Sequence, residues 1–370
     1  MPEATHLSLL ENGAPHAETV RRSTDALAAG KAVILPTETV YGLAFRADGP
    51  EADRFAAAAR GGAEGHPITL HRASATGLGP LVELPAMTTR LLERYSPGPL
   101  TVVVRPGEDT EGPLAAALRA VTHGGWAGVR IPSHAGAAAI LEAAHFPVAV
   151  VSLRGTDGVP AATAEGAARA PGAEVATLLL DGGEASLGQP STAVALGRGR
   201  FELLREGIVE PEAIKSTAGL RILFVCTGNT CRSPMAEALA RRAIQEAIGD
   251  AEEGRFGFEV RSAGVYAGPG APGSDNSVAA MADRGIDLTG HASRPVIDHE
   301  VQEFDRVYCL THSHRDALLS VLPPGAASRV ELIDPDGRDV PDPFGGPLEI
   351  YRATADVIED FVRRRTPEWV

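Results

Sequence analysis

The chain has 370 residues, of which 44% are hydrophobic and 22% are charged. This length exceeds what one hydrophobic core usually supports, so the sequence predicts two domains of ordinary globular composition. The formal net charge of −14 argues against broad coating of nucleic acid, so any anion site must be local. Three cysteines are too few for a disulfide framework, and no apolar run reaches the length of a membrane span. The sequence therefore predicts a cytoplasmic protein with no membrane or secretory segment.

The first half of the chain reads as strands and short Ala-rich helices without a strict order. A helix ends near Gly30, and a buried strand then runs into a loop marked by Pro36. This pattern predicts a mixed α/β or α+β domain. The further predicted elements are strands over residues 99–106, 125–132, 146–153 and 175–183, and a hairpin over residues 191–207.

The second half alternates strands and helices after a short closing helix and linker at residues 209–220. Such alternation predicts a doubly wound parallel sheet. The predicted elements are strands over residues 221–226, 258–264, 306–311 and 328–334, a long helix from Pro234, and helices over residues 274–285 and 348–365.

Two of the three cysteines, Cys226 and Cys231, lie in one small polar loop between a predicted strand and a predicted helix. Parallel sheets bind ligands beyond the carboxyl ends of their strands, where a helix N-terminus offers free N–H groups and a positive dipole end. Gly228 allows the loop to curl so that successive amides face inward. The amides, the dipole and Arg232 would favour a thiolate at Cys226.

The guanidinium of Arg232 has the planar fork that pairs with two phosphate oxygens. The loop is therefore suited to a tetrahedral anion that is attacked by sulfur. The alternative is a structural cysteine in an ordinary strand-to-helix turn.

Three motifs carry a resemblance over residues 221–366. The spacing C-x5-R-[ST] runs from Cys226 to Ser233, "SAG" stands at Ser262–Gly264, and "DPFGG" stands at Asp342–Gly346. With these motifs the segment resembles the low-molecular-weight protein phosphatases, which use no cofactor and act on phosphorylated proteins.

The resemblance implies a role for each residue of the motifs. Cys226 is the nucleophile that forms a phosphocysteine, and Arg232 holds the phosphoryl oxygens. Ser233 donates a hydrogen bond to the thiolate, and Asn229 orients the loop. Asp342 protonates the leaving group and then activates water. The alternative for Asp342 is a solvated loop aspartate.

Two positions bear on the choice of substrate. In the tyrosine-specific branch the residue four after the cysteine is typically a bulky aliphatic, whereas Thr230 stands here. With "DPFGG", the segment "CTGNTCRSPMAE" resembles the bacterial protein arginine phosphatases, which implies that Thr230 helps to select phosphoarginine. Phosphotyrosine is the alternative substrate. The predicted phosphate-loop and specificity residues are Thr227, Gly228, Asn229, Thr230, Cys231, Ser233 and Phe344.

Two further questions concern the cysteines. Arsenate reductase shares this scaffold but needs additional cysteines, and the remaining Cys309 is predicted to be a buried, inert thiol. Cys231 could form a reversible disulfide with Cys226, or it could be only a small loop residue.

Other polar residues in this half are predicted to have no chemical role. His312 and His314 are predicted to be solvated loop histidines, since no third metal ligand is near. Asp334, Asp336 and Asp339 are predicted to be loop residues, because the glycine is misplaced for a calcium loop.

The first half carries a second resemblance over residues 12–214, to the YrdC-like domain of threonylcarbamoyl-AMP synthases. It implies a curled α/β sheet with a positively lined groove for threonine, bicarbonate and ATP with Mg, and a link to tRNA or double-stranded RNA. The motifs that carry it are "LPTETVYGLAF" at 35–45, "HPITLH" at 66–71, "SPGPLTVVV" at 96–104, "VRIPSH" at 129–134, "GQPSTAV" at 188–194 and "LLREG" at 203–207.

Groove residues follow from the resemblance position by position. Thr37 could instead cap a loop, and Arg130 could belong to a surface ion pair. The implied residues are Thr37, His71 and Arg130 on the threonine side, Ser152, Ser191 and Arg205 nearer the nucleotide, and Arg60 for the triphosphate.

The first half also departs from the pattern of that family. The Lys-x-Arg pair falls on Arg60 and Gly62, so one cation is missing, and the Ser-Ala-Asn triplet is Ser152-Leu153-Arg154. Each lost polar contact to a polyphosphate would cost about 1–3 kcal/mol. Synthase activity and a nucleotide- or RNA-binding module are therefore both left open.

Overall fold

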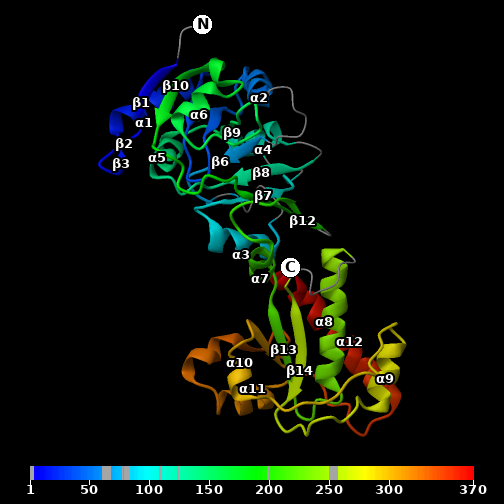
Figure 1. Ribbon diagram of the computed structural model, residues 1–370. Coiled ribbons are helices and arrows are strands. Elements are labelled where there is room, and N and C mark those ends of the chain that lie inside the picture. The colour runs from blue at the N-terminus through cyan, green and yellow to red at the C-terminus, as the bar shows by residue number, and fades with distance from the viewer. Residues whose placement is uncertain are drawn as a thin grey trace. The chain divides into compact units, whose positions relative to one another are not determined.

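The chain folds into two compact units, Met1–Ile214 and Lys215–Val370, each with its own sheet. The computed structural model describes residues 4–60, 68–76, 78, 84–107, 111–122, 125–197, 200–249 and 257–370. Figure 1 shows the strands of both units with helices packed against them. The predicted α/β class is confirmed for both halves of the chain. No helix within these described ranges is long and apolar enough to cross a membrane.

The N-terminal unit is built on one mixed sheet of ten strands, in the order β1-β10-β4-β5-β9-β6-β8-β7-β11-β12. The predicted hairpin is confirmed, because β11 and β12 pair antiparallel. The strands are β1 (Thr5–Ser8), β4 (Ala32–Leu35), β5 (Gly42–Arg46), β6 (Thr69–His71), β7 (Leu100–Val104), β8 (Ala127–Arg130), β9 (Val148–Ser152), β10 (Ala176–Asp181), β11 (Thr192–Gly197) and β12 (Arg200–Arg205), with a separate pair β2 (Leu10–Glu11) and β3 (Ala14–Pro15). The helices are α1 (Ala17–Ala28), α2 (Ala52–Arg60), α3 (Ala86–Tyr95), α4 (Pro113–Ala120), α5 (Ala135–Ala143), α6 (Ala164–Arg169) and the 3-10 helix η2 (Ala173–Val175), and α7 (Pro211–Ala218) contains the boundary between the two units.

The register of the central strands gathers polar side chains on one stretch of this sheet. Arg130 on β8 pairs with His71 on β6 and with Thr101 on β7. Gly42 on β5 pairs with Ser152 on β9. Because directly opposed residues point to the same face, Thr101, Arg130 and His71 form a row across three strands.

The C-terminal unit is a four-stranded parallel sheet in the order β14-β13-β15-β16. The predicted doubly wound arrangement is confirmed, because helices connect strands that run in one direction. Its elements are β13 (Arg221–Cys226), α8 (Arg232–Ile248), β14 (Glu259–Gly264), α9 (Asp275–Ala282), α10 (Asp298–Val301), β15 (Arg306–Cys309), α11 (His312–Leu319), the 3-10 helix η4 (Pro324–Arg329), β16 (Val330–Leu332) and α12 (Leu348–Trp369).

Side chains of β13 alternate between two cores. Leu223 and Val225 belong to the cluster that contains Val301 of α10 and Leu318 of α11. On the opposite face, the Phe224 ring centroid lies 5.8 Å from that of Tyr308 and 6.3 Å from that of Trp369 on α12. Since side chains two apart share a face, Cys226 points to the same side as Phe224. Figure 1 shows α8 and α12 together beside β13 and β14.

Trp369 closes the face of the sheet that carries Cys226. The indole is fully buried, and its Nε1 donates to the Tyr308 hydroxyl at 3.0 Å. We expect Trp369→Ala to lower the free energy of unfolding of this unit by about 3–5 kcal/mol, because it leaves a large cavity. Hydrogen exchange of the β13 amides measures this loss. The exposed Val321 is the control, and Val321→Ala should change stability by about 0.5 kcal/mol or less.

Candidate functional site

Cys226 is the last residue of β13, and the loop of residues 227–231 joins it to α8, which begins at Arg232. The thiol is buried, and its Sγ lies 3.0 Å from the Ser233 hydroxyl oxygen. The strand is apolar and buried from Ile222 onward and Pro234 lies in the first turn of the helix, so the chain must turn within these five residues. The loop therefore lies where the N-terminal amides of α8 point toward the nucleophile.

Asn229 holds the loop in shape from inside. Its φ of 54° lies in the left-handed region, which asparagine tolerates better than most residues. The fully buried side-chain amide donates to the hydroxyls of Ser233 and Ser262, both at 2.9 Å, and accepts from the Arg294 amide at 2.9 Å. Ser262 in turn donates to a carboxylate oxygen of Glu237 at 2.6 Å. Each polar atom of this amide is therefore used.

Glycine is needed beside the loop rather than at the position that the sequence indicated. Gly228 has no positive φ, and an added Cβ would meet nothing closer than 3.8 Å, so our expectation that Gly228 permits the turn is wrong. The strained position is Asn229. At Gly264, which ends β14, a Cβ would lie 2.5 Å from the Thr227 carbonyl oxygen and 2.9 Å from the Asn229 nitrogen. Only glycine allows β14 to approach the loop this closely.

Arg232 and Asp342 meet at the mouth of this loop. The guanidinium is buried and donates to an Asp342 carboxylate oxygen at 2.8 Å and to the Val340 carbonyl at 3.4 Å. Asp342 is 54% exposed, and its other oxygen accepts from the Phe344 amide at 3.2 Å. The Phe344 ring is 80% exposed. The structure thus brings a carboxylate to a thiol and a cation that lie more than a hundred residues before it in the sequence.

The segment that carries Asp342 is anchored by Asp334, which the sequence indicated only as a loop residue. The Asp334 carboxylate is buried and accepts from Arg338 Nε at 2.5 Å and from Arg364 on α12 at 3.0 Å. Burial would raise the pKa of Asp334, but hydrogen bonds from Arg338 and from two backbone amides lower it to about 2. A second anchor joins Asp339 to the amide and the ring of His312.

The cysteines are free thiols and all three are buried. Cys231 donates to the Ser274 hydroxyl at 3.3 Å, and its Sγ lies 3.7 Å from the Tyr351 hydroxyl. Burial raises the pKa of Tyr351. The predicted inert Cys309 is confirmed as a buried thiol, and burial raises its pKa to about 12. A disulfide between Cys226 and Cys231 stays a prediction.

Two histidines of the site were missed by sequence reasoning. His291 lies 2.7 Å from the Asn229 carbonyl oxygen, to which its Nε2 donates. His314, predicted to be solvated, is in fact 4% exposed on α11, and its Nε2 lies 2.8 Å from the Thr227 hydroxyl. Burial is the first cause that lowers the pKa of His314, to about 4, and the charge of Arg232 adds to it. No local motif marks either residue, because both reach the loop from elements 60 to 90 positions away.

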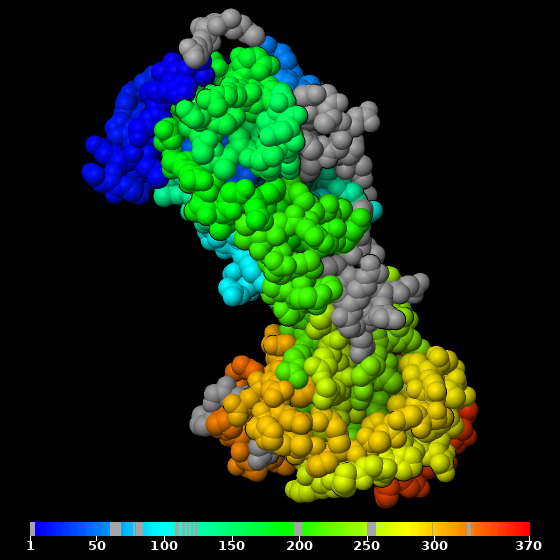
Figure 2. Space-filling view, viewed as in Figure 1, coloured from blue at the N-terminus to red at the C-terminus, as the bar shows by residue number. Residues whose placement is uncertain are grey.

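The remaining predicted loop residues lie around the mouth. The Thr230 hydroxyl lies 3.6 Å from the Cys231 sulfur, and the Thr230 carbonyl accepts from the Ser274 amide at 2.9 Å. The Thr227 carbonyl accepts from the Tyr266 amide at 2.9 Å. The segment that contains Tyr266 lies on the surface of this unit, in the yellow region of Figure 2.

The N-terminal unit has a second polar site on the face described above. A small pocket of about 20 Å³, close to the size of one water molecule, lies over the row of polar residues on the central strands. Six of the seven groove residues implied by the sequence line it: Thr37, His71, Arg130, Ser152, Ser191 and Arg205. Arg60 ends α2, and Gly62 lies outside the described residues.

The cations of this pocket differ in their partners. Arg130 donates to the Glu38 carboxylate at 2.7 Å, and both side chains are buried, so the alternative of a surface pair is wrong. Its Nε is buried and has no hydrogen-bond partner among the residues that the structure describes. Arg205 donates to the carbonyl and the hydroxyl of Ser191 at 3.0 and 2.9 Å. Burial, followed by the nearby charges of Arg130 and Arg154, lowers the pKa of Arg205 to about 10.

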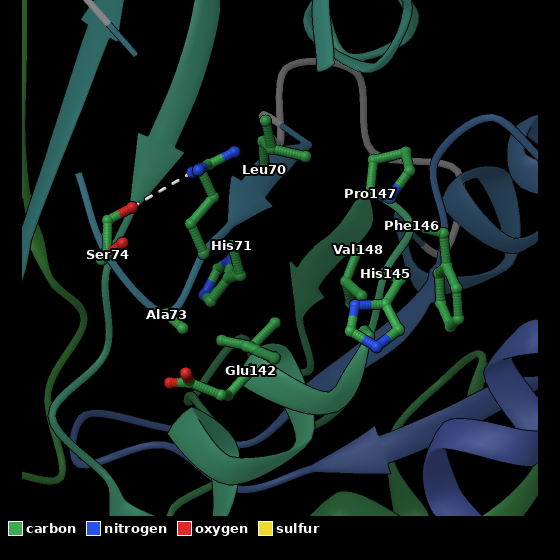
Figure 3. A pocket seen from close by; sticks show the side chains of 12 residues that line it. Leu70, His71, Ala73, Ser74, Glu142, His145, Phe146, Pro147 and Val148 are labelled. Carbon is green, nitrogen blue, oxygen red and sulfur yellow. Dashed lines mark hydrogen bonds between the residues drawn. The ribbon is translucent and has the colours of Figure 1, made fainter. Parts of the chain in front are cut away.

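His71 also lines a larger pocket of about 280 Å³, which Figure 3 shows between the end of β6 and the end of α5. The His71 Nδ1 donates to the Thr69 carbonyl at 3.2 Å, so its Nε2 is a hydrogen-bond acceptor. Burial lowers the pKa of His71 to about 3, with the charge of Arg130 as the second cause. Glu142 and His145 lie at the outer side of the larger pocket.

With both sites described, the comparisons with known proteins identify the family. Residues 221–366 match the family model for low molecular weight phosphotyrosine protein phosphatase. A curated protein-arginine-phosphatase from Bacillus subtilis is 37% identical over 146 residues, which cover 39% of this chain and 92% of that enzyme. The chain belongs to the low-molecular-weight protein phosphatase family. A crystal structure of a YwlE mutant from Bacillus subtilis is 35% identical, covers 40% of this chain and 97% of its own, and has a TM-score of 0.36.

The N-terminal part of this phosphatase matches a different family. Residues 25–207 match the Sua5/YciO/YrdC model, which is described as telomere recombination. A threonylcarbamoyl-AMP synthase from Pyrococcus abyssi is 31% identical over 201 residues, or 54% of this chain. The match spans 57% of the length of that synthase.

Asp334 gives the phosphatase unit a measurable acid sensitivity. Its pKa is about 2 in the fold and 3.8 for the unperturbed group, so the stability it contributes is present above pH 4 and is lost as the pH falls toward 2. We expect Asp334→Asn to lower the free energy of unfolding at pH 7 by about 1–3 kcal/mol and to flatten its pH dependence between pH 4 and 2. Urea unfolding at a series of pH values tests this. An unchanged slope in the variant would contradict the assignment.

Proposed function

We propose that the C-terminal unit removes phosphate from arginine side chains of proteins through a phosphocysteine on Cys226. The observation that carries this proposal is the meeting of Arg232 and Asp342, joined at 2.8 Å, at the mouth of the loop that follows Cys226. A thiol at a helix N-terminus, a phosphate-binding guanidinium and an exposed carboxyl are together the groups that a two-step phosphoryl transfer requires.

In the first step the Cys226 sulfur attacks phosphorus, an S–P bond forms and the P–N bond to the guanidino group breaks. Arg232 and the loop amides hold the equatorial oxygens, and the Ser233 hydroxyl, whose oxygen lies 3.0 Å from the sulfur, is placed to donate to the thiolate. The phosphoryl oxygens offer Arg232 new acceptors, which frees Asp342 from the ion pair. In its protonated form, Asp342 then gives its proton to the departing nitrogen.

In the second step Asp342 acts as a base. It takes a proton from a water molecule, whose oxygen attacks the phosphocysteine, and the S–P bond breaks to release inorganic phosphate and the Cys226 thiolate. The 54% exposure of Asp342 supports this role, because both the leaving group and the water must reach it. This sequence needs no metal and no oxidant.

Thr230 and Phe344 support arginine as the substrate side chain. Thr230 places a small side chain with a hydroxyl group beside the loop. Such a side chain is a better neighbour for a polar guanidinium than for a phenyl ring. Phe344 follows the acid at two residues and offers an exposed ring over which a guanidinium can stack. The relative that is 37% identical over 92% of its length carries the name protein-arginine-phosphatase.

Matched peptides test this substrate. We expect the wild-type enzyme to hydrolyse a phosphoarginine peptide with a kcat/KM at least about tenfold above that for a phosphotyrosine peptide of the same sequence, since each tenfold corresponds to about 1.4 kcal/mol. Thr230→Ile should lower the ratio of the two kcat/KM values, because it replaces the hydroxyl with a larger apolar group. Cys226→Ser should abolish both activities. A wild-type preference for phosphotyrosine would refute the arginine proposal and leave the phosphatase chemistry intact.

We also propose that the N-terminal unit binds threonine and the phosphates of ATP in the pocket lined by Arg130 and Arg205. The support is the convergence of six implied groove residues on one pocket, which include the buried guanidinium of Arg130, paired with Glu38, and the half-buried guanidinium of Arg205. The small enclosed volume requires the pocket to open around a nucleotide. The described residues contain no group of three His, Cys, Asp or Glu side chains that could hold a metal, so Mg would arrive with ATP.

In the reaction proposed for this unit, threonine, bicarbonate and ATP are converted to threonylcarbamoyl-AMP and pyrophosphate. The threonylcarbamoyl group is then transferred to tRNA. A binding module without turnover is the alternative. Both proposed activities are compatible with a location in the cytoplasm, which the three free thiols support.

Arg205 gives a direct test of the second proposal. We expect Arg205→Ala to weaken ATP binding about tenfold or more, because a hydrogen bond from a charged donor contributes about 1.5–3 kcal/mol. Isothermal titration measures the binding, and release of pyrophosphate with threonine and bicarbonate measures turnover. Arg169→Ala, which changes an exposed arginine of α6, is the control. Equal affinity in both variants would contradict the proposal.

A further inference from the structure

The interaction of His314 with the loop that follows Cys226 has no counterpart in the motifs of the sequence. His314 lies in the first turn of α11, and its backbone amide donates to Thr311, which caps that helix. The ring is buried, with Nε2 2.8 Å from the Thr227 hydroxyl and Nδ1 2.9 Å from the Thr311 hydroxyl. One imidazole therefore bridges the residue after the nucleophile and the residue that caps α11.

The protonation state of the ring suits this bridge. Burial and the charge of Arg232 lower the pKa of His314, the charges of Asp342 and Asp339 oppose them, and the result is about 4. At neutral pH the imidazole is uncharged and has one N–H and one lone pair. It therefore donates to one threonine hydroxyl and accepts from the other, which orients both.

Apart from His314, the contacts that hold Thr227 within the described ranges are made by its backbone. Its carbonyl accepts from the Tyr266 amide at 2.9 Å, and Gly264 packs directly against that carbonyl. The residue itself is exposed at the mouth, so a Thr227 side chain without His314 would be free in solvent. With His314 in place, Thr227 is fixed at both its carbonyl and its hydroxyl.

Fixing Thr227 matters because it is the first residue of the turn. Asn229 fixes the later part of the same loop through its buried amide. The amides between these two residues take their direction from both anchors. Donors stabilise a phosphoryl group most when they already point at it. If Thr227 were mobile, the loop amides would therefore bind the phosphoryl group less well.

We propose that His314 is a positioning residue of the phosphatase: by holding the Thr227 hydroxyl, it aims the loop amides at the phosphoryl group. The inference rests on the proposed use of this loop for phosphate, and it assigns His314 no contact with substrate. It extends the phosphate cradle to α11, an element that the motif C-x5-R-[ST] does not include.

Two substitutions separate the two hydrogen bonds of the ring. The side-chain nitrogen of glutamine reaches the position of Nε2, so His314→Gln keeps the contact with Thr227. The nitrogen of asparagine reaches the position of Nδ1, so His314→Asn keeps only the contact with Thr311. We expect His314→Asn to weaken binding of inorganic phosphate and to lower kcat/KM, each by about three- to tenfold, and His314→Gln to stay within about twofold of wild type.

Thr227→Val removes the hydroxyl at nearly constant shape and should reproduce the loss seen in His314→Asn. The double variant should be no worse than either single variant, because both remove the same interaction. His299→Gln on α10, at an exposed histidine of the same unit, should behave as wild type. Thermal unfolding of each variant identifies any loss that comes from a damaged fold.

Phosphate binding is measured by isothermal titration and does not depend on turnover. If wild type binds phosphate but cleaves no phosphopeptide, the proposed function fails while His314 is still tested. If His314→Asn binds phosphate as wild type does, or if the losses of Thr227→Val and His314→Asn multiply, the positioning role is refuted.

Discussion

The phosphatase site depends on one buried amide, that of Asn229. A loop of five residues must turn a chain from a buried strand into a helix and still present its N–H groups inward. Asn229 makes this possible by adopting a left-handed backbone conformation and by using its side chain to hold Ser233, Ser262 and the Arg294 amide. An unsatisfied amide at this depth would cost about 1–3 kcal/mol, so the network holds only as a complete set.

The acid is brought to this loop by a different set of contacts. Asp334 fixes the start of its segment to Arg364 on α12, and Arg232 fixes its end through Asp342. The nucleophile, the cation and the acid therefore come from the carboxyl ends of strands in one parallel sheet and the segments that follow them. Helix N-termini lie at this edge of a parallel sheet, and their dipoles are positive there. The site can therefore attract an anion although the chain carries a net charge of −14.

In the N-terminal unit, a buried ion pair positions a cation at the pocket. Arg130 is neutralised by Glu38, which also accepts from the amides of Ser133 and His134. A pair of this kind adds little stability, since desolvation offsets most of its attraction. Its effect is to fix the direction of Arg130, whose Nε remains available at the pocket. Within the described part of the chain Arg205 donates to neutral groups of Ser191, and its charge is open to an anion.

Several features followed from the sequence alone. The apolar strand before Cys226, Pro234 in the first turn of α8 and the spacing to Arg232 are local, so strand, loop and helix could be predicted from them. The family motifs also implied Asp342 and six groove residues that line one pocket. Three of these six, His71, Arg130 and Ser152, lie on the central strands β6, β8 and β9. Gly228 was misjudged, because the need for a positive φ depends on how the loop closes and not on which residue is glycine.

Only the tertiary structure revealed that Asp334 is buried, that Arg130 pairs inside the fold, and that His291 and His314 reach the Cys226 loop. These residues lie on helices and loops whose own sequences carry no signal of the contact. A hydrogen bond depends on where two segments lie after the chain has folded, and segments 60 to 90 residues apart are brought together by the order of strands in the sheet. That order arises from the packing of both faces, which no local pattern of residues contains.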